Sequence, residues 1–329
     1  MKAAVCDNIN SEWQIKDIEK PTVGPNDVLI KIHASGLCYT DVHLTQGDFG
    51  NKDKFPCVFG HEPVGEVVQV GQAVKCRKIG DRVGVAWIQD SCGRCQWCLR
   101  GKEFFCEGLV VTGIERHGGH AEYMAAPAES TMLIPEELSF EQAAPIFCAG
   151  YTVYSGLRYA EPKPHETIAV VGIGGLGHLA LQYTKAAGFR TIAVTHSPDK
   201  VNLAKDLGAD HVVKNGRELL ACGGADVILS TTNSYKSMMR AARGIRPDGR
   251  IVWMGLSNEP MTITNELFMK RARIIASTQN SREHLYEALD YAAKGSVKVI
   301  TETFPLEEIA TAYKRVESGQ VRFRAVIKM

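Results

Sequence analysis

The sequence predicts an α/β protein with two domains, one rich in β-strands and one built on a doubly wound parallel sheet. A length of 329 residues exceeds what one compact core of ordinary size accommodates. Residues 1–149 carry short β-branched runs separated by Gly, Pro and Asp, which is typical of a β-rich domain with loops. Residues 150–277 alternate β-branched runs with amphipathic helical stretches, which is the signature of the parallel sheet. Residues 278–329 hold two helical stretches and a last strand-like run, and the pattern alone assigns them to neither domain.

Each expected element corresponds to a short stretch of sequence. The strands expected in the β-rich part are "DVLIKIHASG" (27–36), "PVGEVVQVG" (63–71), "DRVGVAW" (81–87) and "AEYMAAP" (121–127). A helix is expected over residues 139–160, with Ser139 as its N-cap. The later strands are expected at 167–173, 190–196, 225–232 and 250–256, and the helices between them at 176–188, 198–208 and 234–245. The chain is expected to close with helices at 281–295 and 305–319 and a strand at 322–329.

Composition and charge are those of an ordinary globular enzyme. The chain is 45% hydrophobic, and 38 basic residues balance 37 acidic ones, which argues against a nucleic-acid partner. The stretch "MKAAVCDNIN" lacks the apolar region of a signal peptide, and no run approaches the roughly 18 apolar residues of a membrane span. We therefore expect a cytoplasmic protein that does not bind membranes. Its ten cysteines are expected to be reduced thiols, available as metal ligands or catalytic groups.

Four cysteines crowd into residues 91–106, "SCGRCQWCLRGKEFFC", which we call the thiol loop. Cys92, Cys95, Cys98 and Cys106 follow the spacing C-x2-C-x2-C-x7-C, which suits a tetrahedral zinc with four thiolate ligands. Four buried free cysteines, or an iron–sulfur cluster, are the alternatives, although the usual cluster spacings differ from this one. A four-thiolate zinc has no open position for a substrate, so the site would be structural.

A second metal site is suggested by three separate segments. "GLCYTDVH" contains Cys38, "FGHEPVGE" contains His61, and "PIFCAGYTVY" contains Cys148. Three such ligands would leave a fourth position open on zinc, which is the catalytic pattern. Spacing alone does not show that these groups meet, and a histidine beside a strand can equally be a core or surface residue.

The stretch "AVVGIGGLGHLA" predicts a dinucleotide site. Gly172, Gly174 and Gly177 form G-x-G-x-x-G between a β-branched run and a helix, with Gly175 and Leu176 completing the loop. Glycines there permit a tight turn and close approach of a pyrophosphate to the helix N-terminus, whose N–H groups favour an anion. A glycine-rich turn without a ligand is the alternative.

The end of the next expected strand predicts which dinucleotide is preferred. NAD enzymes usually carry an acid about 20 residues beyond the glycines, where it bonds the ribose 2′-hydroxyl. Here Thr195 takes that position, followed by His196 and Ser197, with Lys200 one turn later. Hydroxyls, an imidazole and an ammonium favour a 2′-phosphate, whereas an acid repels it. Asp199 lies nearby, but at an expected helix start, where acids are common. The sequence therefore predicts a preference for NADP(H).

Together, "GLCYTDVH", "PCVFGHEPVGEV", "CGRCQWCLRGKEFFC", "CAGYTVY" and "GIGGLGHLA" resemble the zinc-dependent alcohol dehydrogenases of the medium-chain dehydrogenase/reductase superfamily. The resemblance is collinear over essentially the whole chain. It implies a GroES-like catalytic domain around an inserted Rossmann domain, with residues 278–329 returning to the catalytic domain. It also implies two zinc ions per chain: a catalytic one on Cys38, His61 and Cys148, and a structural one on the thiol loop.

The resemblance assigns roles to residues near the catalytic ligands. Asp41 would bond the free ring nitrogen of His61 and fix its tautomer, although a turn residue is the alternative. Glu62 would be an acid near the metal, or else an exposed glutamate. Thr40 would take the alcohol's proton and pass it through the cofactor ribose to His43 and solvent.

Three further positions follow from the resemblance. Many relatives have a histidine where this chain has Tyr39, so this chain keeps a hydrogen-bonding hydroxyl there but lacks the imidazole of a histidine-type phosphate contact. Trp87 lies where the family lines its substrate pocket, and a core position is the alternative. Arg324 matches a position that contacts the pyrophosphate; otherwise it would be a solvated strand charge.

The expected activity is hydride transfer between NAD(P)(H), with NADP(H) favoured, and a primary alcohol or its aldehyde. A polyol or secondary-alcohol dehydrogenase of the same superfamily is the closest alternative. A zinc ribbon that binds nucleic acid or protein leaves the glycine loop unexplained. A zinc-free quinone or enone reductase lacks the Cys and His ligands. The resemblance also implies a homo-oligomer, either a dimer or a tetramer.

Overall fold

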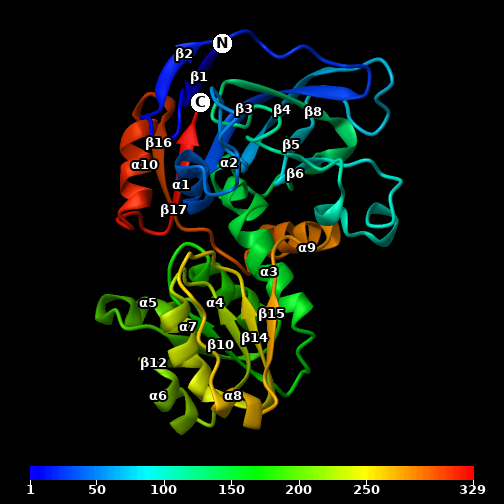
Figure 1. Ribbon diagram of the computed structural model, residues 1–329. Helices are drawn as coiled ribbons and strands as arrows, with labels where there is room; N and C mark the ends of the chain where they lie inside the picture. The colour runs from blue at the N-terminus through cyan, green and yellow to red at the C-terminus, as the bar shows by residue number, and fades with distance from the viewer. The chain divides into compact units, whose positions relative to one another are not determined.

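The computed structural model describes residues 1–329, which divide into two compact units. The first unit contains Met1–Cys148 and Val299–Met329, and the second contains Ala149–Lys298. The blue N-terminal part and the red C-terminal segment of Figure 1 therefore belong to the same unit. The α/β fold class predicted from the sequence, with a β-rich part and a doubly wound parallel sheet, is confirmed.

The first unit is built on a seven-stranded sheet around β3 (Asp27–Leu37). β3 runs antiparallel to β4 (Pro63–Val70), β8 (Tyr123–Pro127) and the C-terminal β17 (Arg324–Lys328). The remaining strands of this sheet are β5 (Arg82–Gly84), β9 (Met132–Leu133) and β16 (Thr301–Pro305). Two small sheets pair β1 (Lys2–Val5) with β2 (Gln14–Asp17) and β6 (Ile88–Asp90) with β7 (Val110–Val111). The helices of this unit are α1 (Tyr39–Gln46), α2 (Phe140–Ala143) and α10 (Ile309–Glu317).

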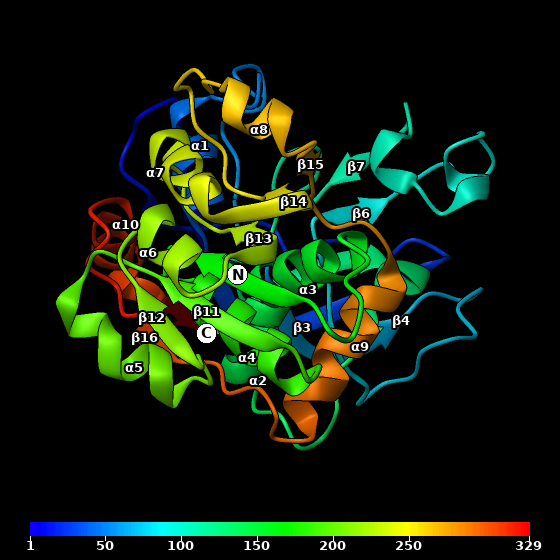
Figure 2. The same cartoon turned by 90° about the horizontal axis from the view of Figure 1, so that it is seen from below.

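The second unit is a six-stranded parallel sheet in the order β12-β11-β10-β13-β14-β15. Its strands are β10 (Thr167–Val171), β11 (Arg190–Val194), β12 (His211–Val213), β13 (Ala225–Ser230), β14 (Ile245–Trp253) and β15 (Arg273–Ala276). Its helices are α3 (Ala149–Tyr159), α4 (Gly177–Ala186), α5 (Val201–Asp206), α6 (Gly216–Ala221), α7 (Tyr235–Ala241), α8 (Asn265–Met269) and α9 (Arg282–Ala293). α3, α4 and α9 cover one face of the sheet, and α6 and α7 lie on the other (Figure 2). Every residue of β10 is buried, because helices cover both sides of it.

The chain returns to the first unit at residue 299, so the boundary expected at residue 278 is wrong. Residues 278–298 stay with the parallel sheet because α9 packs on α3 and α4. Leu285 and Leu289 of α9 are buried, and the Tyr183 hydroxyl donates a 3.0 Å hydrogen bond to the carbonyl of Ala288.

The single helix expected over residues 139–160 is also wrong. The N-cap is as expected, since the Ser139 hydroxyl accepts a hydrogen bond from the N–H of Gln142. Beyond α2 the chain forms a 3₁₀ turn over Ala144–Phe147 and leaves helical geometry at Cys148, where φ is −123° and ψ is −73°. Pro145 lies in this turn and cannot donate the backbone hydrogen bond that an uninterrupted helix requires. The break separates Cys148 from α3.

None of the ten cysteines forms a disulfide. No helix combines the length and the apolar character that crossing a bilayer requires.

The helix after β10 approaches the strand so closely that only glycine fits at its first residue. A Cβ atom at Gly177 would lie 1.9 Å from the carbonyl oxygen of Gly172. At Gly174, in the same loop, a Cβ atom would have no neighbour within 4 Å.

The difference in space at Gly177 and Gly174 can be tested with an alanine variant at each position. Gly177→Ala has to push α4 away from β10, so we expect the free energy of unfolding to fall by about 1–3 kcal/mol. Gly174→Ala should change it by less than about 0.5 kcal/mol. Urea denaturation of the two variants and the wild type measures both values. Equal unfolding energies for the two variants would contradict the close-approach argument.

Candidate active site

Two of the expected zinc ligands are held by one buried carboxylate. Cys38 follows the end of β3 and precedes α1, and Asp41 lies in the first turn of that helix. Asp41 Oδ2 accepts a 2.8 Å hydrogen bond from the N–H of Cys38, and Oδ1 accepts a 3.3 Å bond from the N–H of Gly60. Oδ1 also lies 3.4 Å from Nδ1 of His61. The helix start and the segment before β4 are thereby joined at the site.

The structure brings Cys38, His61 and Cys148 together, with Glu62 as a fourth potential ligand; we call these residues the Cys38 cluster. Their ligand atoms all lie within 4.8 Å of one another. The sulfurs of Cys38 and Cys148 are 3.9 Å apart, and Nε2 of His61 lies 3.3 Å from the Cys148 sulfur. Two thiolates on one tetrahedral zinc stand about 3.8 Å apart, because each Zn–S bond is about 2.3 Å. The donor set and its spacing therefore fit a zinc ion.

The electrostatics of the Cys38 cluster favour a cation. A hydrogen bond between the two thiols holds the pKa of Cys38 well below its ordinary value and raises that of Cys148 well above it. Loss of one proton from the pair is therefore favoured at Cys38, and it leaves a negative charge that a cation can compensate. Burial by itself would lower the pKa of His61, but the Asp41 carboxylate and the Cys38 sulfur raise it well above the usual range. A metal ion that replaces the protons on the thiols and on His61 would compensate the negative charge of the sulfurs and of the Asp41 carboxylate.

Glu62 is completely buried beside the ligands, and its carboxylate is hydrogen-bonded by the guanidinium of Arg324. Burial raises the pKa of Glu62 to about 7, although Arg324 acts in the opposite direction. Gly36 on β3 makes room for this carboxylate, since a Cβ atom there would lie 1.9 Å from Glu62 Oε2. The alternative of an exposed glutamate is therefore wrong, and so is the alternative of a solvated charge at Arg324. The structure pairs Arg324 with Glu62, and a pyrophosphate contact stays a prediction.

The other residues expected at the catalytic site follow Cys38 or lie near His61. The Thr40 hydroxyl lies 3.6 Å from the Cys38 sulfur. The Trp87 ring packs edge-on against His61 with ring centroids 5.2 Å apart. His43, on the last turn of α1, contacts the half-exposed ring of Tyr39 with ring centroids 5.1 Å apart. Phe49, which was not predicted from the sequence, packs against Trp87 with ring centroids 5.7 Å apart. These residues form an aromatic wall that runs from His61 toward His43.

The thiol loop forms the second cluster of sulfurs. The sulfurs of Cys92, Cys95, Cys98 and Cys106 all lie within 4.8 Å of one another. Cys98 lies 3.9 Å from Cys92 and 3.5 Å from Cys95, which is near the spacing that zinc imposes. Hydrogen bonds from the N–H groups of Arg94 and Cys95 lower the pKa of the Cys92 thiol to about 6. Donation of backbone N–H groups to sulfur stabilises the thiolate form that a metal requires.

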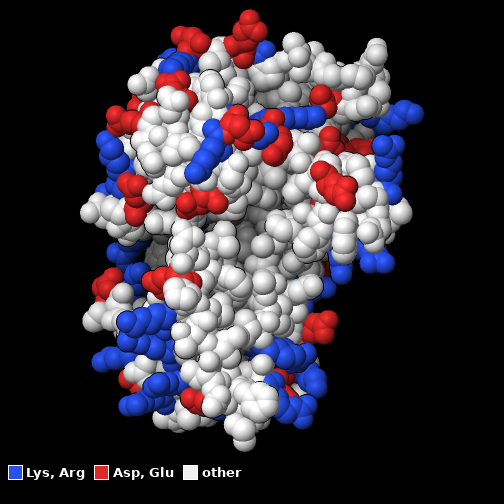
Figure 3. Space-filling view, in the orientation of Figure 1, with Lys and Arg blue, Asp and Glu red and all other residues white.

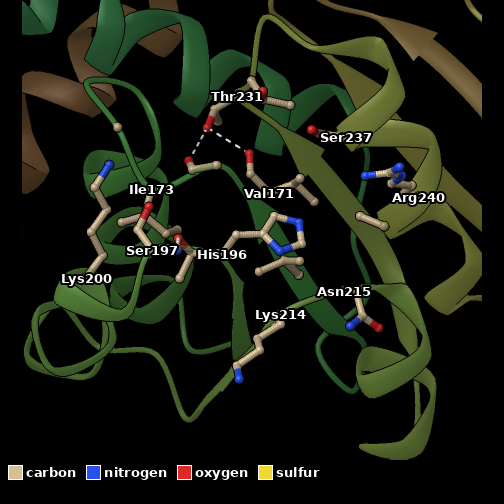
Figure 4. Close-up of a pocket in the computed structure, with 16 residues that line it drawn as sticks. Val171, Ile173, His196, Ser197, Lys200, Lys214, Asn215, Thr231, Ser237 and Arg240 are labelled. Atoms are coloured by element: carbon tan, nitrogen blue, oxygen red, sulfur yellow. Dashed lines mark hydrogen bonds between the residues drawn. The ribbon is translucent and has the colours of Figure 1, made fainter. Parts of the chain in front are cut away.

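The glycine loop borders a pocket of about 310 Å³ in the second unit (Figure 4). It lies beyond the carboxyl end of β10, where the sheet order turns from β11 to β13 and where nucleotides bind in such sheets. The Thr231 hydroxyl donates to the carbonyl of Gly172 at 2.6 Å and supports the loop. Of the predicted cofactor residues, those that line the pocket are Gly172, Gly174, Thr195, His196, Ser197 and Lys200. Gly175, Leu176 and Gly177 lie in the turn and at the start of α4, outside the lining.

The opposite wall of this pocket was not predicted from the sequence. Lys214 and Asn215 follow β12, and Ser237 and Arg240 lie on α7. The only sequence signal for these four residues is their position, because two of them directly follow a strand of the parallel sheet and two lie on a helix next to the predicted site. No carboxylate lines the pocket. Figure 4 shows Lys200, Lys214 and Arg240 on three sides of His196, and Figure 3 shows Lys and Arg side chains gathered around α5 and α6 of this unit.

A β-rich unit with two sulfur clusters, joined to a parallel sheet with a glycine-loop pocket, defines the class of zinc-type dehydrogenases. Residues 24–136 match the family model described as alcohol dehydrogenase GroES-like domain, and residues 175–294 match zinc-binding dehydrogenase. An alcohol dehydrogenase of Geobacillus stearothermophilus is 42% identical over 336 residues, covering 100% of both chains. The chain belongs to the zinc-type medium-chain alcohol dehydrogenase family.

Solved structures agree with this assignment. A structure described as NAD-dependent alcohol dehydrogenase matches with a TM-score of 0.94 at 29% identity, covering 100% of both chains. A cinnamyl alcohol dehydrogenase from Sorghum bicolor matches at 0.90 and 30% identity, covering 99% of this chain and 97% of the other. The CAD from Helicobacter pylori, complexed with NADP(H), matches at 0.89 and 26% identity, covering 100% and 97%.

The two clusters generate a prediction about metal content. Purified protein should hold two zinc ions per chain, and Cys95→Ser and Cys38→Ser should each reduce this to about one. Because only Cys106 of the four cysteines is buried, a metal would supply much of the loop's stability, and Cys95→Ser should also lower Tm by about 5–10 °C. Elemental analysis and thermal denaturation measure both effects. Cys76→Ser, at an exposed free cysteine, is the control and should leave both unchanged. Two zinc ions in Cys95→Ser would contradict the assignment of the thiol loop.

Proposed function

We propose that this protein is a zinc-dependent alcohol dehydrogenase that interconverts a primary alcohol and its aldehyde, with NADP(H) favoured over NAD(H). The observation that carries the proposal is the Cys38 cluster, with the Asp41 carboxylate facing His61, in a chain of this family. Curated relatives described as alcohol dehydrogenases support the same activity. Two clusters that require reduced sulfur are consistent with a cytoplasmic location.

Zinc bound by Cys38, His61 and Cys148 would act as a Lewis acid that lowers the pKa of the alcohol. The protein's own groups then position the ligands and move the proton. The Asp41 carboxylate favours the His61 tautomer with its proton on Nδ1, which leaves the Nε2 lone pair for the metal. The Thr40 hydroxyl, 3.6 Å from the Cys38 sulfur, would accept the alcohol's proton while passing on its own, and His43 would receive the proton before solvent.

The preference for NADP(H) rests on the charges around the glycine-loop pocket. Lys200, Lys214 and Arg240 border it, and no acid lines the pocket to neutralise them. Thr195 and Ser197 supply hydroxyls at the end of β11. A dianionic 2′-phosphate would gain charge-assisted hydrogen bonds from these groups and would meet no repulsion.

The test is steady-state turnover of a primary alcohol and its aldehyde by the zinc-loaded enzyme with each cofactor. We expect both directions to proceed, with a higher kcat/KM for NADP(H). Lys200→Ala should raise the KM for NADPH about tenfold and leave the KM for NADH nearly unchanged, because only NADPH carries the 2′-phosphate. Lys205→Ala, an exposed charge on α5 outside the pocket, is the matched control.

Three outcomes would contradict parts of the proposal. Higher kcat/KM with NADH would overturn the cofactor preference and leave the dehydrogenase standing. A polyol or secondary alcohol turned over faster than any primary alcohol would overturn the substrate class. No turnover with either cofactor in protein that holds two zinc ions would overturn the function.

We propose further that the protein is a homo-oligomer that pairs through β15 and α8. β15 is an edge strand, bonded to β14 on one side only. Just before it, Phe268 and Met269 of α8 are each 78% exposed, and Ile263 is 64% exposed. An open strand edge beside large exposed apolar side chains is typical of an interface between subunits.

Light scattering after size-exclusion chromatography tests this interface. Wild type should elute as a dimer or tetramer, and Phe268→Asp combined with Met269→Asp should shift it to a smaller species, because burying two carboxylates is unfavourable. Ile79→Asp, at an exposed apolar residue of the first unit, is the control. A monomeric wild type, or no shift in the double variant, would contradict the proposal.

A further inference from the structure

We infer that Asp48 is a positioning residue for His43: its carboxylate holds the imidazole in the tautomer that takes a proton on Nε2. The inference rests on the proposed function, in which His43 is the last proton acceptor before solvent. Asp48 Oδ2 lies 2.7 Å from Nδ1 of His43, which is the distance of a charge-assisted hydrogen bond. No role for Asp48 follows from the zinc clusters or from the cofactor pocket.

The local backbone brings the two side chains together. α1 ends in a Schellman motif, in which the N–H of Gly47 bonds the carbonyl of Leu44 at 3.1 Å and the N–H of Asp48 bonds that of His43 at 3.0 Å. Gly47 takes the left-handed conformation that the motif requires, with φ +76°. The two residues that face each other across this motif are usually apolar. Here they are His43 and Asp48, so a hydrogen-bonded polar pair occupies a place where a hydrophobic contact is ordinarily found.

The chemistry of the pair depends on which ring nitrogen of His43 the Asp48 carboxylate contacts, and here it contacts Nδ1. The carboxylate has no proton to donate, so Nδ1 must carry one, and the lone pair is left on Nε2. When Nε2 accepts a proton, the N–H bond forms with that lone pair and the ring becomes an imidazolium. The carboxylate at Nδ1 balances the new charge without accepting a proton itself, and release of the Nε2 proton to solvent restores the neutral ring. Without Asp48, either nitrogen could carry the resting proton.

The surroundings of the pair hold the ring in place and limit its contact with water. The Tyr39 ring packs edge-on against His43, and the Phe49 ring does so at 6.3 Å. The side chains of His43 and Asp48 are 17% and 34% exposed. A carboxylate at this partly buried position orients the ring more strongly than solvent would, while some exposure keeps a route for the proton to leave.

The test combines kinetics with nitrogen NMR of the zinc-loaded enzyme. Asp48→Asn should lower kcat for alcohol oxidation about tenfold and leave the KM values for alcohol and cofactor within about twofold, because proton transfer and not binding is impaired. In a His43→Gln background the same change should have no further effect, because Asp48 acts through His43. Asp53→Asn, at an exposed acid of the following segment, is the matched control and should match wild type.

The NMR measurement separates positioning from a merely structural effect. In enzyme labelled with ¹⁵N-histidine, the signal lost in His43→Gln identifies His43. We expect protonated Nδ1 and unprotonated Nε2 in wild type at a pH above the titration of the ring, and a shift toward the Nε2-protonated tautomer in Asp48→Asn. Asp48→Ala, which places no amide beside the ring, should give a mixture of both tautomers.

Two results would overturn the inference: a wild-type His43 protonated on Nε2 in its neutral form, or an Asp48→Asn enzyme with wild-type kcat. Additive losses in the double variant would assign Asp48 an effect independent of His43 and would also overturn it. If wild type turns over no alcohol, the proposed function fails, whereas the tautomer measurement still decides whether Asp48 positions the ring.

Discussion

The Asp41 carboxylate is the group on which the candidate site depends. It is fully buried, and such a charge is tolerated only when hydrogen bonds and opposite charges compensate it. Here the N–H groups of Cys38 and Gly60 supply the hydrogen bonds, and His61 lies 3.4 Å away. One side chain therefore ties the start of α1 to the segment before β4 and orients a candidate metal ligand on each. A loss of this carboxylate would therefore free two of the candidate ligands at once.

Compensation of a second buried carboxylate ties the end of the chain to the first unit. β17 lies antiparallel to β3, whose carboxyl end leads into Cys38, so Arg324 at the start of β17 reaches the buried Glu62. A buried carboxylate next to two sulfurs would be strongly destabilising without this guanidinium. Gly36 supplies the space, because any side chain there would collide with Glu62. Sheet register, one glycine and one ion pair together bring the last strand into the site.

The two units use different physical means to bind their proposed ligands. The first concentrates soft sulfur and nitrogen donors, which bind a metal through directed bonds. The second presents a glycine loop, the end of a buried strand and unpaired cations, which suit an anion of extended shape. Packing explains the separation. The parallel sheet buries both faces and leaves only its carboxyl edge for a ligand, whereas the β-rich unit presents ligands from loops and helix starts.

The sequence by itself determined the features that depend on short-range spacing. These are the alternation of strands and helices, the glycine loop and the four cysteines of the thiol loop, because residues a few positions apart meet whatever the rest of the chain does. Cys38, His61 and Cys148 were suggested as ligands by their residue types, but only the family resemblance predicted that they meet, since their separation along the chain carries no geometry. Tertiary structure alone decided the burial of Glu62 with Arg324, the Lys214 and Arg240 wall of the pocket and the return of the chain at residue 299. Each depends on sheet register or on helix packing between distant segments, and no local pattern of residues encodes either.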